Sequence, residues 1–162
     1  MNGYPKYFLP LFQAMVILVT LSGLLLIPAL LVFRLQWDGD GLDTLMTLPI
    51  TSGQTRAALT SLHAIVGWGL VWLLGAIWSL HIRSHWRKKE NRLNGGIFLS
   101  VWAILVTSSL GIYYFGDADW SQTSSLIHVG LGLTIPGMLY AHRKFGKRSV
   151  ERKSARQGER AS

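Results

Sequence analysis

Four long stretches of this chain contain no charged side chain and are dominated by hydrophobic residues: Tyr7–Phe33, Ala57–Ile82, Leu93–Gly116 and Trp120–His142. About 20 apolar residues in an α-helix span the hydrocarbon core of a bilayer, and each stretch exceeds that length. The 162-residue chain therefore predicts an all-α, integral membrane four-helix bundle over residues 1–145. The few remaining residues leave no room for a separate soluble catalytic domain.

The first hydrophobic stretch is expected to be a retained membrane span rather than a signal peptide. It is much longer than the apolar region of a signal peptide, which has about 7–15 residues, and no small-x-small cleavage site follows it.

Basic residues concentrate on one side of the predicted membrane. Segment 83–92 carries five Lys/Arg and one Glu, and segment 143–162 carries eight Lys/Arg and two Glu, whereas 34–56 and 117–119 together hold two Arg and five Asp. The positive-inside rule then predicts that both termini are cytoplasmic, as for a multi-pass protein of the bacterial inner membrane. We expect residues 146–162 to be a disordered basic tail that attracts anionic lipid rather than nucleic acid.

The chain has no cysteine. A Cys-ligated iron–sulfur cluster, covalently attached haem, a thiol nucleophile and a disulfide are therefore excluded. Any redox centre would have to be held by histidine ligands or by non-covalent packing alone.

Two of the four stretches carry two histidines each, His63 with His81 and His128 with His142, at spacings of 18 and 14 residues. At about 100° per residue, 18 residues make five turns and 14 residues fall about 40° short of four, so each pair lies on one helix face. An ionisable residue inside a membrane span is by default a functional candidate. Both stretches run inward in the predicted topology, which pairs His63 with His128 at an outer level and His81 with His142 at an inner level.

Imidazoles from two facing helices supply the two axial ligands that a six-coordinate haem needs. The sequence therefore predicts two non-covalent b-type haems between Ala57–Ile82 and Trp120–His142. The two levels are about 27 Å apart along the first of these helices and about 21 Å apart along the second. This mismatch weakens the inner pair, and His85 is the first substitute for His81 as its ligand.

Glycines follow the two outer histidines at the same distance. Gly67 lies four residues after His63, and Gly132 lies four residues after His128. Position i+4 is one turn along the same face, so a glycine there leaves room for a large flat ring. The alternative is that glycine is simply common in membrane helices.

Other residues on the same faces complete the expected cofactor site. Four apolar residues lie between the two histidine levels and are expected to fill the space there: Leu70, Leu74, Ile135 and Leu139. Arg83 and Arg143 lie near the inner level, where they are expected to face anionic haem propionates.

With these residues placed, the chain resembles the bacterial di-haem b-type membrane cytochromes. This group includes the cytochrome b subunits of respiratory hydrogenases and formate dehydrogenases and the four-helix haem bundle of quinol-oxidising cytochrome b. The resemblance covers most of residues 57–143 and rests on His63-x-x-x-Gly67, His81, His128-x-x-x-Gly132 and His142. It implies a chain that carries electrons across the membrane between a quinone pool and a partner redox subunit, without a catalytic residue of its own.

Three other classes of membrane protein compete with this interpretation. A chlorophyll-type pigment-binding subunit would also use membrane histidines beside glycines, but independent pigment sites need no pairing by level. A haem-free membrane anchor subunit would keep the topology and leave the matched pairs unexplained. A small transporter would need a polar pathway and broken helices, for which Pro136 is the one hint.

Overall fold

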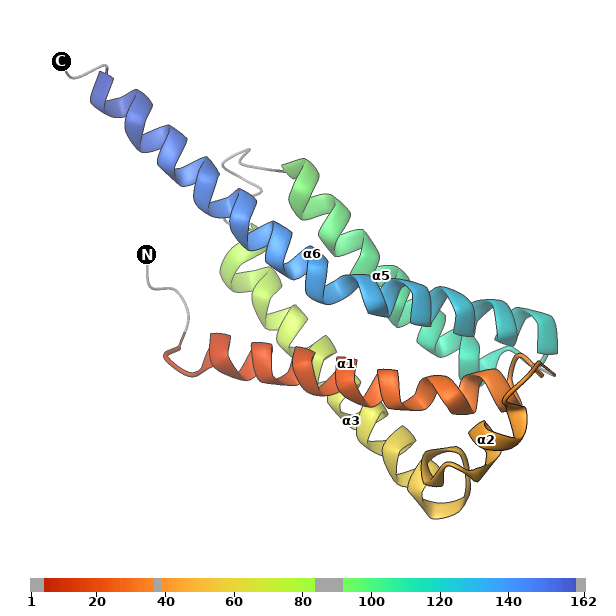
Figure 1. The fold of residues 1–162 in the computed structure, drawn as a ribbon. Helices are drawn as coiled ribbons and strands as arrows, with labels where there is room; N and C mark the ends of the chain where they lie inside the picture. Colours follow the sequence, from red (N-terminus) through yellow and green to blue (C-terminus); the bar gives the residue numbers. More distant parts are fainter. Residues whose placement is uncertain (1–4, 37–38, 84–91, 160–162) are drawn as a thin grey trace.

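The structure is a computed structural model that describes residues 5–36, 39–83 and 92–159, with the side chains of 80–81 and 147–159 outside the description. Over this part it is all-helical, and its long helices are α1 (Phe8–Phe33), α3 (Gly53–Ile77), α5 (Arg92–Tyr114) and α6 (Ala118–Glu159) (Figure 1). Three of these helices, together with the Ala118–Gly146 part of α6, are long and apolar enough to cross a membrane. The predicted multi-pass, all-α architecture is confirmed at this level.

The four long helices form two helical hairpins. α3 packs along α1, α6 packs along α5, and the hairpins meet chiefly where α1 contacts α6. In Figure 1 the start of α1 and the end of α6 lie on the left, and the connection from α1 to α3 lies on the right. The two histidine-bearing helices, α3 and α6, therefore belong to different hairpins.

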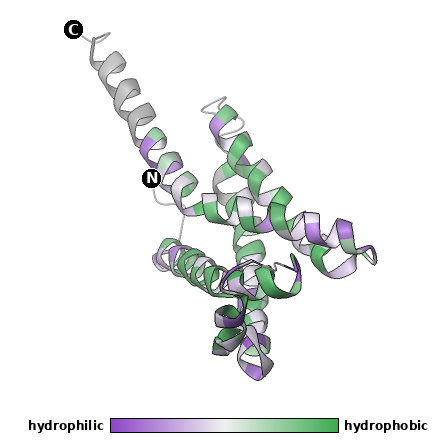
Figure 2. Ribbon diagram, turned by 45° about the vertical axis from the view of Figure 1, so that its right-hand side comes forward, coloured by the Kyte–Doolittle hydropathy of each residue, from purple (hydrophilic) through white to green (hydrophobic). Residues whose placement is uncertain are grey.

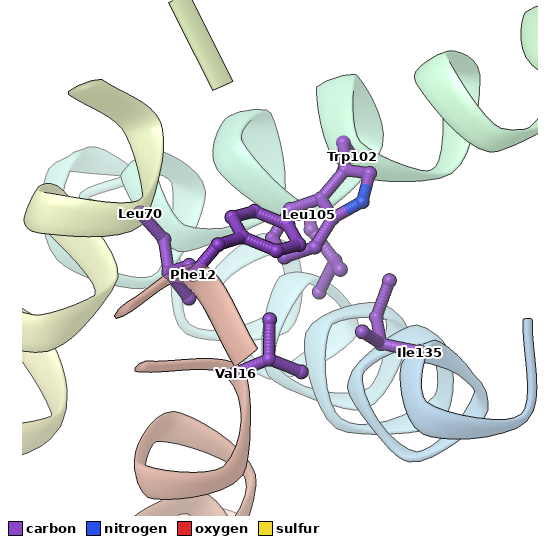
Figure 3. Packing of buried hydrophobic residues seen from close by; sticks show 6 residues of the cluster. All are labelled: Phe12, Val16, Leu70, Trp102, Leu105 and Ile135. Carbon is purple, nitrogen blue, oxygen red and sulfur yellow. The ribbon is translucent and has the colours of Figure 1, made fainter. Parts of the chain in front are cut away.

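A small apolar core joins all four long helices (Figure 3). It contains Phe12, Val16, Leu70, Trp102, Leu105 and Ile135. Leu70 is 1% exposed and Ile135 is 3% exposed, and both Leu74 and Leu139 pack against this core. These four aliphatic residues therefore belong to or line the core, and their position between two histidine levels stays a prediction.

The outward faces of the helices are also apolar. Large hydrophobic side chains such as Leu21, Ile65, Trp72 and Leu133 are exposed, and Figure 2 shows hydrophobic residues over much of the long helices. So many exposed apolar side chains suit contact with lipid rather than with water.

The connection from α1 to α3 contains short helices. Within its described part, α2 (Leu42–Thr47) is followed by the 3₁₀ helix η1 (Pro49–Thr51). The Thr51 residue is 1% exposed, and its hydroxyl lies 2.7 Å from the Leu48 carbonyl and 3.0 Å from the Leu45 carbonyl. These contacts hold the loop in a compact form beside the end of the bundle.

The inner end of α3 departs from α-helical geometry. It continues as a π-helical turn, η2 (Trp78–Ile82), which contains His81. A π turn accommodates one extra residue, which rotates the residues beyond it by about 100° relative to an unbroken α-helix. A shared face for His63 and His81 requires an unbroken α-helix between them, and the π turn interrupts it before His81. The His81 side chain and the whole of His85 lie outside the description.

Residues 146–159 of the basic tail lie in a helix, and residues 160–162 lie outside the description. Helix α6 continues past its apolar part and ends at Glu159. A helix that is already nucleated extends at little further cost through good helix formers, and Lys, Arg, Glu and Gln supply most of this segment.

A substitution at Gly111 tests how closely α5 and α6 pack in the second hairpin. A Cβ built on Gly111 collides with the Ser124 side chain of α6, so the two helices approach closely there. We expect Gly111→Ala to lower the free energy of unfolding in detergent by about 1–3 kcal/mol, because the added methyl group overpacks the contact.

Gly96→Ala is the matched control for this experiment. Gly96 lies on the same helix, and a Cβ built there meets no atom within 4 Å. This variant should be at least as stable as the wild type. Equal stability of the two variants would show that α5 and α6 do not approach each other at Gly111.

Candidate functional site

Two half-buried histidines from different hairpins lie next to each other. The ring centres of His63 on α3 and His128 on α6 are 6.2 Å apart, and the ring planes are inclined at 78°. Although the hairpins meet chiefly through α1 and α6, these two rings come together across them. The structure thus brings together the two histidines that the sequence assigns to the outer level.

His63 is held by the first helix of its own hairpin. Its Nδ1 lies 3.0 Å from the hydroxyl oxygen of Ser22 on α1, and that hydroxyl donates to the Val19 carbonyl at 3.1 Å. When the single hydroxyl proton is directed at Val19, Nδ1 of His63 is the donor to Ser22. The ring lies over Gly23, where a built Cβ would be 3.0 Å from its Cε1 atom.

His128 is held in the same way by the first helix of the second hairpin. Its Nδ1 lies 3.1 Å from the Leu105 carbonyl and 3.2 Å from the Ser108 hydroxyl oxygen, and that hydroxyl donates to Leu105 at 3.0 Å. A carbonyl oxygen only accepts, so Nδ1 of His128 carries the proton. In a neutral imidazole Nε2 then keeps its lone pair.

This pair of imidazoles fits two axial positions on one metal centre. Given a metal–nitrogen distance of about 2.0 Å, two imidazoles on opposite sides of one ion have ring centres about 6 Å apart. Among the described residues, no group of three or more His, Cys, Asp or Glu gathers to hold a metal ion. A haem brings its own equatorial ligands, so two histidines suffice for it.

Gly67 and Gly132 leave space beside the histidine pair. A Cβ built on Gly67 meets nothing within 4 Å, and one built on Gly132 meets only Leu105 Cδ2, at 4.0 Å. Side-chain packing in this structure therefore does not require glycine at either position. Space for at least one more carbon atom is present at both, and room for a flat ring stays a prediction.

The predicted inner residues are arranged differently. Nδ1 of His142 lies 3.3 Å from the amide nitrogen of Asn94, which donates to it, so Nδ1 accepts here. No second described imidazole lies against His142. With its amide oxygen turned towards Arg143, Gln13 accepts from that guanidinium at 2.5 and 3.1 Å. Arg83 is exposed and caps η2.

Aromatic side chains connect His142 to the core. Its ring stacks on Phe98 with ring centres 4.9 Å apart, and Phe98 meets Trp102 edge to face at 6.3 Å. The buried Trp102 indole nitrogen has no hydrogen-bond partner among the described residues. Phe98 and Trp102 thus link the His142 ring to the apolar core.

Sequence reasoning missed the two serines that hold the outer histidines. Ser22 is 3% exposed and Ser108 is 7% exposed, and both lie deep inside apolar helices. A serine at such a depth is a weak signal, because its hydroxyl can bond to a carbonyl of its own helix. Only the pairing of α1 with α3 and of α5 with α6 shows which serine meets which histidine.

No protein-family model, curated protein or solved structure matches this chain. A relation to the di-haem cytochromes b therefore rests on the histidines and glycines themselves.

The open space at the two glycines can be tested by filling it. We expect Gly67→Leu and Gly132→Leu to weaken haem binding at least tenfold while the chain stays folded, because a leucine would occupy the room for the ring. Haem titration followed by absorbance measures this effect.

Gly75→Leu is the matched control. Gly75 is also on α3, and a Cβ built there meets nothing within 4 Å, but it lies 12 residues from His63 and so about 120° away around the helix. If Gly75→Leu lowers the haem affinity as much as Gly67→Leu and Gly132→Leu do, the glycines beside the histidines do not provide the space for the haem.

Proposed function

We propose that this chain is a b-type cytochrome of the bacterial inner membrane that carries electrons across the membrane between a quinone pool and a partner redox subunit. The observation that carries the proposal is the pair formed by His63 and His128. The two rings lie 6.2 Å apart, each is held through Nδ1, and each thereby keeps Nε2 for a ligand. Hydrogen bonding of the second ring nitrogen is typical of histidines that bind metals.

Each proposed ligand has a defined role in the chain. His63 and His128 hold the outer haem, and Gly67 and Gly132 give it room. His142 holds the inner haem together with His81 or, in its place, His85, and this requires the Asn94 amide to turn its oxygen towards Nδ1 so that Nε2 is free. A bound haem supplies one-electron chemistry at its iron.

The remaining site residues exclude water and balance charge. The core around Leu70 and Ile135 keeps the space between the two levels apolar, and the polarity around such a centre controls its potential. Arg83 and Arg143 carry positive charge at the inner level, where they can face the haem carboxylates. Quinone and the partner subunit enter the proposal through the resemblance alone.

The histidine pair favours this proposal over its rivals. A chlorophyll-type pigment subunit needs only one histidine for each pigment, and a haem-free membrane anchor subunit needs none. Neither accounts for two imidazoles that face each other across two hairpins with both Nδ1 atoms engaged.

Haem content tests the proposed function directly. We expect the purified wild-type chain to carry two b-type haems, measured as the pyridine haemochrome. His63→Ala and His128→Ala should each carry one, because each removes a ligand of the same outer haem. The double variant should also carry one.

His85→Ala is the control and should retain both haems if His81 is the inner ligand. A wild-type chain without haem iron would refute the proposed function. A wild-type chain with one haem that survives both outer variants would refute the outer site.

The proposed orientation generates a further test, which the absence of cysteine makes simple. A cysteine placed at Ser52, between α1 and α3, should react with a membrane-impermeant thiol reagent added outside intact cells. A cysteine placed at Ser149, in the C-terminal part of α6, should react only after lysis. The reverse pattern would place both termini outside.

A further inference from the structure

The two outer histidines are held by the same hydrogen-bond arrangement, which occurs once in each hairpin. In each case a serine on the first helix bonds to the carbonyl three residues before it, Ser22 to Val19 and Ser108 to Leu105. The histidine on the second helix then places Nδ1 at 3.0–3.2 Å from that serine oxygen. The two hairpins thus present their histidines to each other through equivalent hydrogen-bond chains.

The direction of the second chain follows from Leu105, because its carbonyl can only accept from Nδ1 of His128. The Ser108 oxygen is then also left as an acceptor for that Nδ1 proton. We assign the same direction to the first chain, with the Ser22 proton directed at the Val19 carbonyl. Successive bonds of this kind polarise one another in a medium of low dielectric constant. Each imidazole therefore becomes a better electron donor at Nε2, the atom left for a ligand.

We propose that Ser22 and Ser108 are positioning residues that set the tautomer and the donor strength of the two outer histidines and thereby tune the outer haem. This inference rests on the proposed function. It adds that the site is arranged before a haem enters, because the hydrogen bonds lie within the chain itself.

Neighbouring hydroxyl groups provide matched controls on the same helices. Thr20 on α1 donates to the Val16 carbonyl, and Ser109 on α5 donates to the Val106 carbonyl. For neither hydroxyl does the structure describe a bond to a histidine. Removing either group therefore deletes a half-buried hydroxyl that bonds to its own helix and leaves the proposed serine–histidine bonds in place.

Haem affinity and reduction potential of the loaded protein test the proposal. We expect the double variant Ser22→Ala with Ser108→Ala to bind the outer haem about 10–100-fold more weakly. Its reduction potential should rise, because weaker donors stabilise ferric iron less. Ser22→Thr with Ser108→Thr keeps both hydroxyls and should restore both properties, whereas Thr20→Ala with Ser109→Ala should leave both unchanged.

A purely structural role for the serines predicts a different result. It would lower thermal stability without raising the potential of the haem that remains bound. Unchanged affinity and potential in the double alanine variant, or equal changes in the control variant, would overturn the proposal.

Nitrogen-15 NMR of the histidine rings separates this proposal from the proposed function. If the wild-type chain as purified carries no haem, the proposed function fails, and the ring tautomers still test the serines. Protons on Nδ1 of His63 and His128, with the proton of His142 on Nε2, would support the proposed role of Ser22 and Ser108. Protons on Nε2 of His63 and His128 would overturn that role.

Discussion

The need to satisfy every polar group inside the protein is the constraint on which the rest of this structure depends. In lipid no water is available to an imidazole N–H, so each outer histidine needs an acceptor from another helix. Ser22 and Leu105 provide acceptors on α1 and α5, the first helices of the two hairpins. Each of these bonds therefore ties a histidine to the neighbouring helix of its own hairpin, and it leaves Nε2 as the free ring nitrogen.

The two hairpins then determine what the outer site can do. One apolar core joins them and contains Leu70 from the first hairpin and Ile135 from the second. Gly67 and Gly132 keep the flanks of the histidines open. An apolar, half-enclosed pair of imidazole ligands suits a flat cofactor with its own equatorial ligands better than a bare ion.

Much of this arrangement could be predicted from sequence periodicity, and some of it could not. Helical spacing and the charge pattern predicted four spans, the common level of His63 and His128, and the burial of Leu70 and Ile135. The π turn at His81 could not be predicted, because an extra residue in a helix leaves no clear trace in hydropathy. The role of Ser108 depends on which helices pair, which a single sequence does not state.

Electron paramagnetic resonance of the oxidised, purified protein shows whether His63 and His128 together bind a haem iron. We expect a low-spin ferric haem with two histidine ligands. Because the rings of His63 and His128 are inclined at 78°, we expect the strongly anisotropic signal that near-perpendicular imidazole planes produce. A high-spin signal from five-coordinate iron, or no haem signal at all, would contradict this pairing.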